Sequence, residues 1–165
     1  MKKYEFTGET KEIRLLFRTA TLHRIRATVA FGIVEVGDLG GWIEKEENLS
    51  HEGKAWVWGN AKVWGNAEVC GDAKVWGNAE VFSASHVLVI GAIGSRNDFT
   101  TFYRDKDNEI TVKCGCFLGK IDRFLEKVTQ THGDSKYALV YRAAVEVAKL
   151  QIDLSGEAPK DADEE

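Results

Sequence analysis

The sequence is poor in the residues that mark secreted or membrane proteins. Its 165 residues include one proline and three cysteines, Cys70, Cys114 and Cys116. An odd cysteine count argues against a disulfide framework, so we expect reduced thiols. No apolar run approaches the ~20 residues of a membrane span, and the first residues, MKKYEFTGETKEIR, lack the apolar core of a signal peptide. We therefore expect a soluble cytoplasmic protein with no membrane partner.

The sequence also lacks a basic block. The net charge of −4 resides in the tail, residues 155–165, which hold five acids and one lysine, and the remainder is neutral. A neutral body without a cationic stripe argues against nucleic-acid binding. The tail contains the only proline, Pro159, and is predicted to be disordered.

A hexapeptide repeat is the strongest pattern that is present. Residues 55–84 read AWVWGN, AKVWGN, AEVCGD, AKVWGN and AEVFSA, and residues 85–90, SHVLVI, continue the spacing in degraded form. Ala-x-Val is the period-two pattern of a short strand, with Ala and Val on one face. The Gly-Asn or Gly-Asp pair that follows suits a sharp corner. Three such strands and corners would close a coil of eighteen residues around Val and Ala.

The repeat resembles the left-handed β-helix of the hexapeptide-repeat family, in which a small residue follows an aliphatic one by four places, as Ala61 follows Val57. It departs from that family because Trp58 and its counterparts stand where the family commonly has Gly. The resemblance implies a mainly β fold: a short left-handed parallel β-helix over residues 49–90. We expect the remainder to divide into N-terminal strands and a cap (1–48), a hairpin and helical hairpin packing on the prism (91–154), and the tail.

The eighteen-residue spacing predicts which outward side chains lie above one another. Five pairs follow, namely Trp58 over Trp76, Trp64 over Phe82, Trp56 over Lys74, Lys62 over Glu80 and Glu68 over His86. Soluble proteins rarely expose so many aromatic side chains, so something should cover them. Two possibilities remain for what covers these rings. One is packing by flanking segments or by a second copy of the chain, and the other is a planar ligand stacked on the rings.

The flanks contain weaker signals. Residues 1–50 have short alternating stretches typical of strands, and residues 37–50 are expected to close one end of the coil. Residues 91–118 predict a further turn and a hairpin. An apolar spacing from Ile121 predicts a helix that stops at Gly133, and a second helix is expected to run to about Ile152. We expect this helical hairpin to cover the tryptophans.

Two flanking segments, GDLGGWIEKEENLS before the repeats and SRNDFTTFYRDKDNEITVKCGCFLGKIDRF after them, resemble small bacteriophage and prophage proteins described as hexapeptide-repeat or polymer-forming cytoskeletal. This resemblance implies no activity. It implies a viral or mobile-element setting, with the host cytoplasm as the location.

Catalytic and metal-binding alternatives have little support. Relatives with the β-helix fold include acyl-CoA-dependent acyltransferases that use a His base, but His86 occupies an outward repeat position, where pairing with Glu68 is expected. The fold's carbonic anhydrases need three His, and only His51 and His86 lie near the repeats. Cys114, Cys116 and His132 lack a fourth ligand and suitable spacing.

We therefore predict a non-enzymatic, self-associating binding protein with no catalytic residue, metal or cofactor. In a phage setting it would sequester a small, nucleotide-derived host defence signal, with Trp stacking the base and Arg holding the phosphate. The predicted ligand-binding residues are Trp58, Trp64, Trp76, Phe82, Arg96 and Arg104. Two alternatives are an acyl-CoA-dependent acyltransferase, and a protein-binding inhibitor or structural component.

Overall fold

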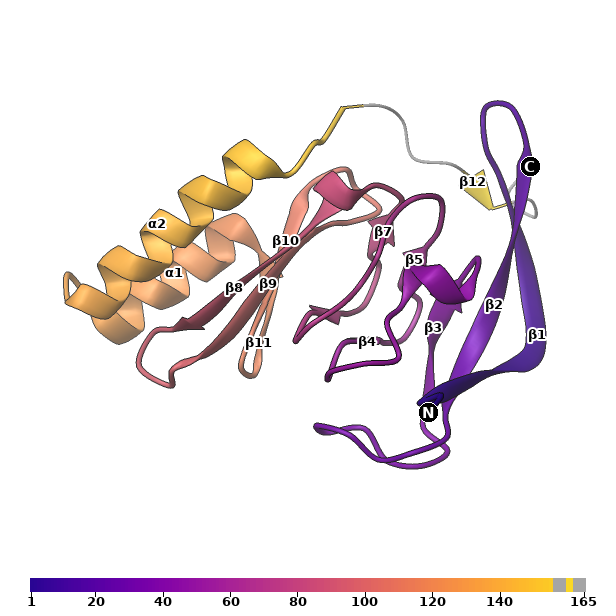
Figure 1. Cartoon of the computed structure of the whole chain (residues 1–165). Coiled ribbons are helices and arrows are strands. Elements are labelled where there is room, and N and C mark those ends of the chain that lie inside the picture. Colours follow the sequence, from indigo (N-terminus) through magenta and orange to yellow (C-terminus); the bar gives the residue numbers. More distant parts are fainter. Residues whose placement is uncertain (156–159, 162–165) are drawn as a thin grey trace.

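A computed structural model describes residues 1–155 and 160–161 (Figure 1). In this part of the chain no helix is long and apolar enough to cross a membrane. The predicted disordered tail, 155–165, lies for the most part outside the described residues.

Strands are the main elements of the chain as far as Lys120, and two helices follow. The strands are β1 (Tyr4–Arg14), β2 (Thr19–Ala27), β3 (Leu39–Ile43), β4 (Trp56–Val57), β5 (Lys62–Val63), β6 (Lys74–Val75), β7 (Glu80–Val81), β8 (Val87–Ile93), β9 (Asp98–Arg104), β10 (Ile110–Cys114), β11 (Phe117–Lys120) and β12 (Lys160–Asp161). The helices are α1 (Ile121–His132) and α2 (Lys136–Gln151), with 3₁₀ turns η1 (Glu46–Asn48) and η2 (Ala84–His86).

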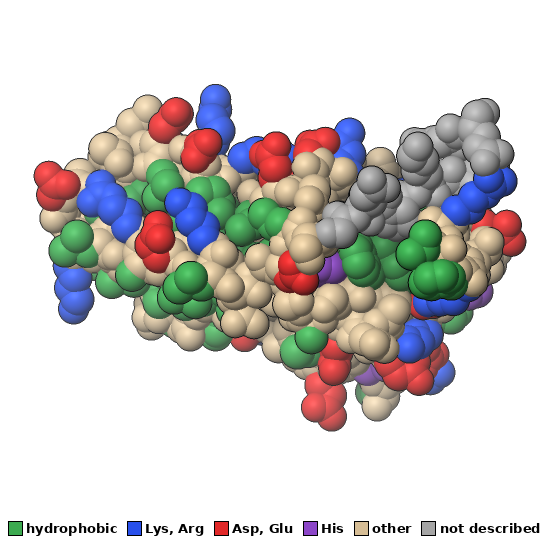
Figure 2. Space-filling model, turned by 90° about the horizontal axis from the view of Figure 1, so that it is seen from above, with side chains coloured by type: hydrophobic (Ala, Val, Ile, Leu, Met, Phe, Trp, Pro, Cys, Tyr) green, Lys and Arg blue, Asp and Glu red, His purple; other side chains and the backbone are tan. Residues whose placement is uncertain are grey.

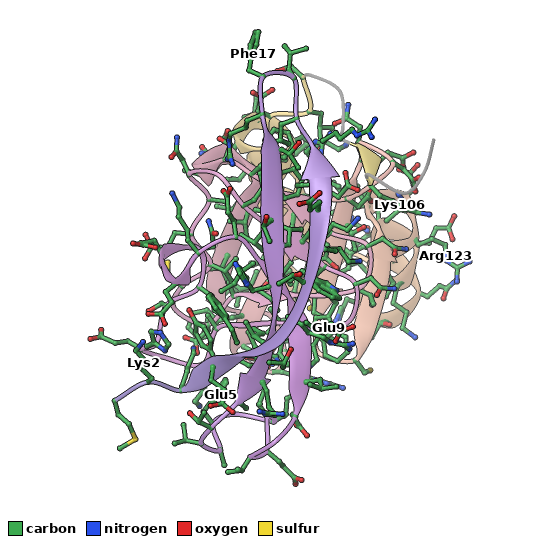
Figure 3. The ribbon with its side chains drawn as sticks, turned by 90° about the vertical axis from the view of Figure 1, so that its right-hand side faces the viewer. Lys2, Glu5, Glu9, Phe17, Lys106 and Arg123 are labelled. Carbon is green, nitrogen blue, oxygen red and sulfur yellow. The ribbon has the colours of Figure 1, made fainter. Side chains whose placement is uncertain are left out.

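The strands form three sheets. A six-stranded mixed sheet has the order β12-β1-β2-β3-β5-β7, a four-stranded antiparallel sheet has the order β11-β10-β9-β8, and β4 pairs with β6 alone. Strands β1 and β2 make a long antiparallel hairpin, which Figure 3 shows in front of the rest of the molecule with Phe17 at its tip. Strand β3 joins this hairpin to the repeats, because it pairs antiparallel with β2 and parallel with β5.

The prediction of a left-handed β-helix is wrong, because residues 1–155 and 160–161 form no solenoid. Each repeat strand is only two residues long. Strands β5 and β7 extend the mixed sheet that begins with the N-terminal hairpin, and β4 and β6 form a separate pair. Where a third strand pair would complete the expected coil, the described residues form an isolated bridge between Leu49 and Val69. Five repeats amount to less than two eighteen-residue turns, so segments outside the repeats complete part of their backbone hydrogen bonding. The amides of Trp42 and Glu44, for example, donate to the carbonyls of Ala61 and Val63.

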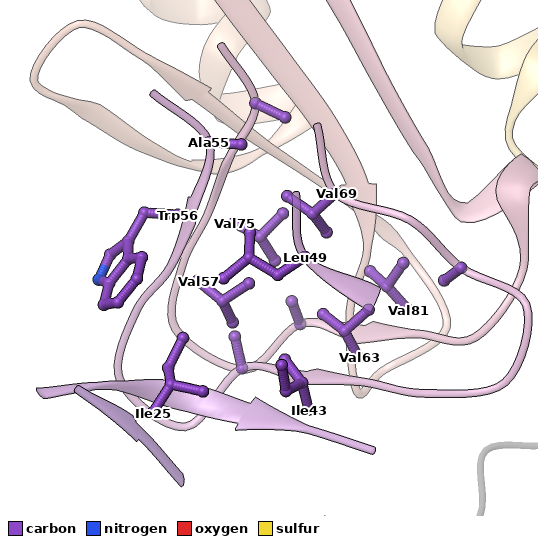
Figure 4. Packing of buried hydrophobic residues seen from close by; sticks show 14 of the residues in the cluster. Ile25, Ile43, Leu49, Ala55, Trp56, Val57, Val63, Val69, Val75 and Val81 are labelled. Atoms are coloured by element: carbon purple, nitrogen blue, oxygen red, sulfur yellow. The ribbon is translucent and has the colours of Figure 1, made fainter. Parts of the chain in front are cut away.

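The side-chain pattern of the repeats is nevertheless present. Parallel pairing joins residues eighteen apart, Trp56 with Lys74 and Lys62 with Glu80. The repeated Val and Ala side chains are buried in one cluster and converge from several strands (Figure 4). Buried members of the pattern are Ala55, Val57, Ala61, Val63, Ala67, Val69, Ala73, Val75, Ala79 and Val81.

Residues 85–90 do not continue the repeat as predicted. Strand β8 runs antiparallel to β9 and belongs to the four-stranded sheet. The alternation of its apolar side chains explains this placement. Val87 and Val89 pack against the repeat core, whereas Leu88 and Ile90 pack against the cluster that contains the helices. The sheet β8–β11 is therefore a layer with apolar side chains on both faces.

The two predicted helices and the hairpin predicted within residues 91–118 are confirmed. Helix α1 ends before Gly133, which has a φ of 58°, and β9 and β10 pair as a hairpin. Both helices pack on the far face of the four-stranded sheet, through a cluster that includes Phe102, Phe124 and Val145. They therefore cover this sheet, and the expectation that they would cover the tryptophans is wrong, because the sheet lies between the helices and the repeats (Figure 1).

Candidate functional site

The structure confirms both predicted aromatic stacks. The ring centroids of Trp58 and Trp76 lie 4.4 Å apart with nearly parallel planes, and those of Trp64 and Phe82 lie 4.9 Å apart. The eighteen-residue spacing therefore places the aromatic side chains correctly, even though the strands between them are short.

The chain itself covers much of this aromatic surface. Trp64 is buried beneath the β1–β2 hairpin in a cluster that includes Ile13 and Leu22. Trp56 is fully buried, with the ring of Phe31 5.3 Å away. For these two indoles, flanking segments provide the cover, so neither has a face open to a ligand.

The Trp58–Trp76 stack is less covered, and both side chains are partly exposed. The ammonium of Lys113 lies 4.8 Å from a ring centroid of Trp76. Trp76 also lines a shallow pocket of about 200 Å³ that contains Lys120. Asp105 already binds the Lys120 ammonium at 2.6 Å, so this pocket does not present an unpaired cation.

Arg104, predicted to hold a phosphate, is fully buried. Its guanidinium lies over the Phe82 ring at 4.9 Å. Its Nη1 donates to the carbonyl of Glu80 at 3.2 Å, and its Nε donates to the side-chain oxygen of Asn108 at 2.8 Å. These contacts join β9 to the end of the repeats. Arg104 therefore has a structural role, and a ligand cannot reach its guanidinium.

Arg96 lies elsewhere, on a cleft of about 230 Å³ between the four-stranded sheet and the helices. The β8–β9 turn, the β10–β11 turn and the C-terminal end of α1 form its walls. We call it the Arg96 cleft. The six predicted residues therefore divide among three places: the Trp58–Trp76 stack, the buried group of Trp64, Phe82 and Arg104, and this cleft.

Two tight turns shape the Arg96 cleft. Gly94 has a φ of +78°, and a Cβ there would lie 1.8 Å from the hydroxyl oxygen of Tyr141. Gly115 has a φ of +56°, and its would-be Cβ lies 2.9 Å from Nη1 of Arg96. Only glycine combines this backbone conformation with so close an approach. The two glycines thus let Tyr141 and Arg96 lie against the turns.

The cleft has a charged rim and an apolar wall. Arg96 and Lys127 line it, and neither makes an ion pair with any described residue. Phe117, Phe124 and Val128 supply the apolar part. A concave site with apolar walls and a few polar groups is the usual form of a small-molecule site.

Tyr141 supplies a hydrogen-bond donor within the cleft. Burial raises the pKa of its hydroxyl to about 12, with further contributions from Cys114 and Asp98, and Arg96 opposes the shift. The hydroxyl is therefore protonated at neutral pH. It can donate a hydrogen bond to a carbonyl, ring nitrogen or phosphate oxygen of a ligand.

Cys114, Cys116 and His132 line the same cleft. Cys116 is exposed, and the hydroxyl of Thr100 lies 3.4 Å from the Cys114 sulfur. Within residues 1–155 and 160–161, however, no three metal-binding side chains form a group that could hold an ion. The three residues contribute polar and polarisable surface to the cleft.

The two histidines near the repeats have structural contacts. His86 is 2 % exposed, and its Nδ1 accepts a hydrogen bond from the Phe82 amide at 3.1 Å, so the prediction of a surface His86 is wrong. Burial and the charge of Arg104 lower its pKa. His51 stacks on Tyr4 at 4.1 Å, and its Nδ1 accepts from the Lys3 amide. Neither imidazole lines the Arg96 cleft.

The sequence-based prediction missed most of the cleft. Lys127, His132 and Tyr141 lie on helices, where a 3.6-residue period reports only which face is buried. Of the six predicted ligand-binding residues, only Arg96 is found there. The Cys-Gly-Cys sequence at 114–116 was a usable signal, because it marks a tight turn at the end of a strand.

No protein-family model matches the sequence, and no curated protein matches it either. The resemblance to phage hexapeptide-repeat proteins therefore stays a prediction. A function has to be inferred from the chemistry of the Arg96 cleft.

Proposed function

We propose that this protein is a non-catalytic binding protein that holds a small, phosphate-bearing, nucleotide-derived ligand in the Arg96 cleft. By sequestering this ligand, the protein would keep a signalling molecule from reaching its receptor. The observation that carries the proposal is a pair of cations, Arg96 and Lys127, that make no ion pair with any residue the structure describes and lie beside an apolar wall.

The cations favour a phosphate. A guanidinium can donate two parallel hydrogen bonds to phosphate oxygens, and an ammonium adds a second positive charge. Because Arg96 and Lys127 have no ion pair among the described residues, a phosphate need not displace a carboxylate from them. Asp98 also lines the cleft and would repel a phosphate placed beside it, so the phosphate is expected on the Arg96–Lys127 side.

The rest of the cleft suits a base or sugar. Phe117 and Phe124 offer apolar surface, and Tyr141 offers a hydroxyl group that can recognise a polar edge. The volume of about 230 Å³ is below the ~300–1,000 Å³ typical of drug-sized ligands. It favours one nucleotide unit over a dinucleotide. In this arrangement Phe117 takes the stacking role predicted for the tryptophans.

The acyltransferase alternative receives no support from the position of its expected base. His86 is buried and its Nδ1 is engaged by the Phe82 amide, so a substrate cannot approach that nitrogen without rearrangement of η2.

Isothermal titration with nucleoside monophosphates, cyclic nucleotides and ADP-ribose tests the proposal. We expect at least one of them to bind, with affinity reduced at least tenfold in Arg96→Gln and in Lys127→Gln. Arg123→Gln is the matched control, because it removes one charge from an exposed position of α1 that does not line the cleft (Figure 3). Absence of heat for the whole panel, or equal losses in Arg123→Gln, would overturn the proposal.

Thiol labelling locates the ligand independently. Cys116 lines the cleft, whereas Cys70 is an exposed cysteine in the repeats. The ligand should slow alkylation of Cys116 by N-ethylmaleimide and leave the rate at Cys70 unchanged, as read by peptide mass spectrometry. Equal rates at Cys116 with and without the bound ligand would place that ligand outside the cleft.

A further inference from the structure

Helix α2 has two apolar faces, and among the described residues only one of them is packed. The inner face is buried against the four-stranded sheet and α1, through Ala138, Tyr141, Ala144, Val145 and Ala148. The outer face has Leu139 at 60 %, Val147 at 47 % and Leu150 at 89 % exposure, with Ala143 also exposed between them. At 100° per residue, these four side chains fall within about 80° of one another, opposite the buried set.

This outer apolar face is exposed at the surface of the molecule. Helix α2 is an outermost element in Figure 1. Figure 2 shows hydrophobic side chains gathered over the helical half, with charged side chains beside them. A surface leucine alone needs no explanation, but a stripe along about three turns of one helix is a usual mark of an interaction surface.

We infer that the outer face of α2 binds the same face of a second copy of this protein, with the two helices antiparallel. About a two-fold axis near the middle of α2, Leu139 would meet the partner's Leu150 and Ala143 would meet the partner's Val147. The small Ala143 side chain allows the helices to approach closely. An isologous contact of this kind closes on itself, so it produces a dimer and not a filament.

The charges at the ends of α2 favour the antiparallel direction. Lys136 is the first residue of the helix, and Asp153 lies two residues beyond its last residue. Antiparallel packing brings Lys136 near the partner's Asp153 at both ends. Parallel packing would bring like charges together and align the helix dipoles unfavourably.

The size of the contact sets its strength. A helix of 16 residues is roughly 24 Å long. One helical face of that length buries far less than the roughly 800 Å² per partner of a standard stable interface. The dimer is therefore weak and depends on concentration, with dissociation in the micromolar range or above.

This inference does not depend on the proposed ligand. Tyr141, which lines the Arg96 cleft, lies on the inner face of α2, and the stripe lies on the opposite face. Dimerisation therefore leaves the cleft open. Failure of ligand binding and failure of dimerisation can be observed separately.

Sedimentation velocity over a range of micromolar concentrations tests the dimer. The wild-type protein should show a rising weight-average sedimentation coefficient, and Leu150→Glu should stay monomeric with an unchanged circular dichroism spectrum. Ile33→Glu is the matched control, because Ile33 is also an exposed apolar residue, at 66 %, and lies away from α2 in the loop between β2 and β3. A wild-type monomer at every concentration, or a loss of the dimer in Ile33→Glu but not in Leu150→Glu, would overturn the inference.

A charge exchange tests the direction of the helices. Lys136→Asp and Asp153→Lys should each weaken dimerisation several-fold, and the double variant should restore it. If the single variants dimerise as well as the wild type, or if the double variant is no better than either, the antiparallel arrangement is wrong.

Discussion

The two aromatic stacks of the repeats occupy equivalent places in successive units, yet their surroundings differ. Trp64 on Phe82 lies under the β1–β2 hairpin, and Trp64 is only 2 % exposed. Trp58 on Trp76 has only partial cover, with Lys113 over the Trp76 ring. Both stacks have the same spacing in the sequence and similar ring geometry.

The difference shows that a repeat determines which side chains stack, but not what covers the stack. The cover of Trp64 comes from residues that precede the repeats and do not share their period, such as Ile13 and Leu22. We therefore expect equivalent substitutions in the two stacks to have unequal effects on stability.

Trp64→Ala should have the largest effect. Removing a fully buried indole leaves a cavity beneath the hairpin and should lower the free energy of unfolding by about 3–5 kcal/mol. Urea denaturation followed by circular dichroism measures this loss, and Trp64→Phe should lose less. A loss below about 1 kcal/mol would mean that the hairpin does not seal this stack.

Trp58→Ala should cost less than Trp64→Ala, about 1–2 kcal/mol, because the side chain is partly exposed and its main loss is the stacking contact with Trp76. The same denaturation experiment gives the comparison directly. Equal losses of stability in the two variants would show that the cover provided by the hairpin does not make Trp64 more important for stability than Trp58.

Lys113→Ala should have a smaller effect, about 0.5–1 kcal/mol, because it removes the cation–π contact between the Lys113 ammonium and the Trp76 ring. Lys106→Ala is the control, since Lys106 has an exposed side chain (Figure 3). Identical thermal unfolding of Lys113→Ala and the wild type would show that the ammonium does not stabilise the stack.

The carboxylate of Glu44 should make the smallest contribution to the free energy of unfolding, and this contribution should disappear at acidic pH. Hydrogen bonds from the Arg18 side chain and the Gly65 amide lower its pKa, and these bonds link the hairpin region to the repeats. Because the folded state favours the charged carboxylate, its contribution is full above the unfolded pKa near 4.5 and is lost as the pH falls. It should be below about 1 kcal/mol, since Arg18 is half exposed.

The pH dependence of Glu44→Gln checks this assignment. At neutral pH the variant should be less stable than the wild type, and the two should converge as the pH falls below the pKa of the carboxyl group. A constant difference down to strongly acidic pH would assign the loss to something other than the carboxylate charge.

The predictions from sequence succeeded where contacts follow from a local period. The buried Val and Ala positions, both stacks, the β9–β10 hairpin and the two helices all reflect repeats of two, six or 3.6 residues. The β-helix prediction failed because too few repeats are present to complete their own backbone pairing. Strand β8 was misplaced because four consecutive apolar residues, 87–90, fit a strand buried on both faces as well as a degraded repeat.

The candidate site was largely beyond prediction from sequence. Arg96, Gly115 and Tyr141 come from two turns and a helix, and no period relates them. The amino-acid sequence by itself determined the eighteen-residue spacing and the inward face of valine and alanine, because neighbouring residues alone set those patterns. Only the tertiary structure decided which indoles are covered and where a cleft remains, because both depend on how separately folded layers meet.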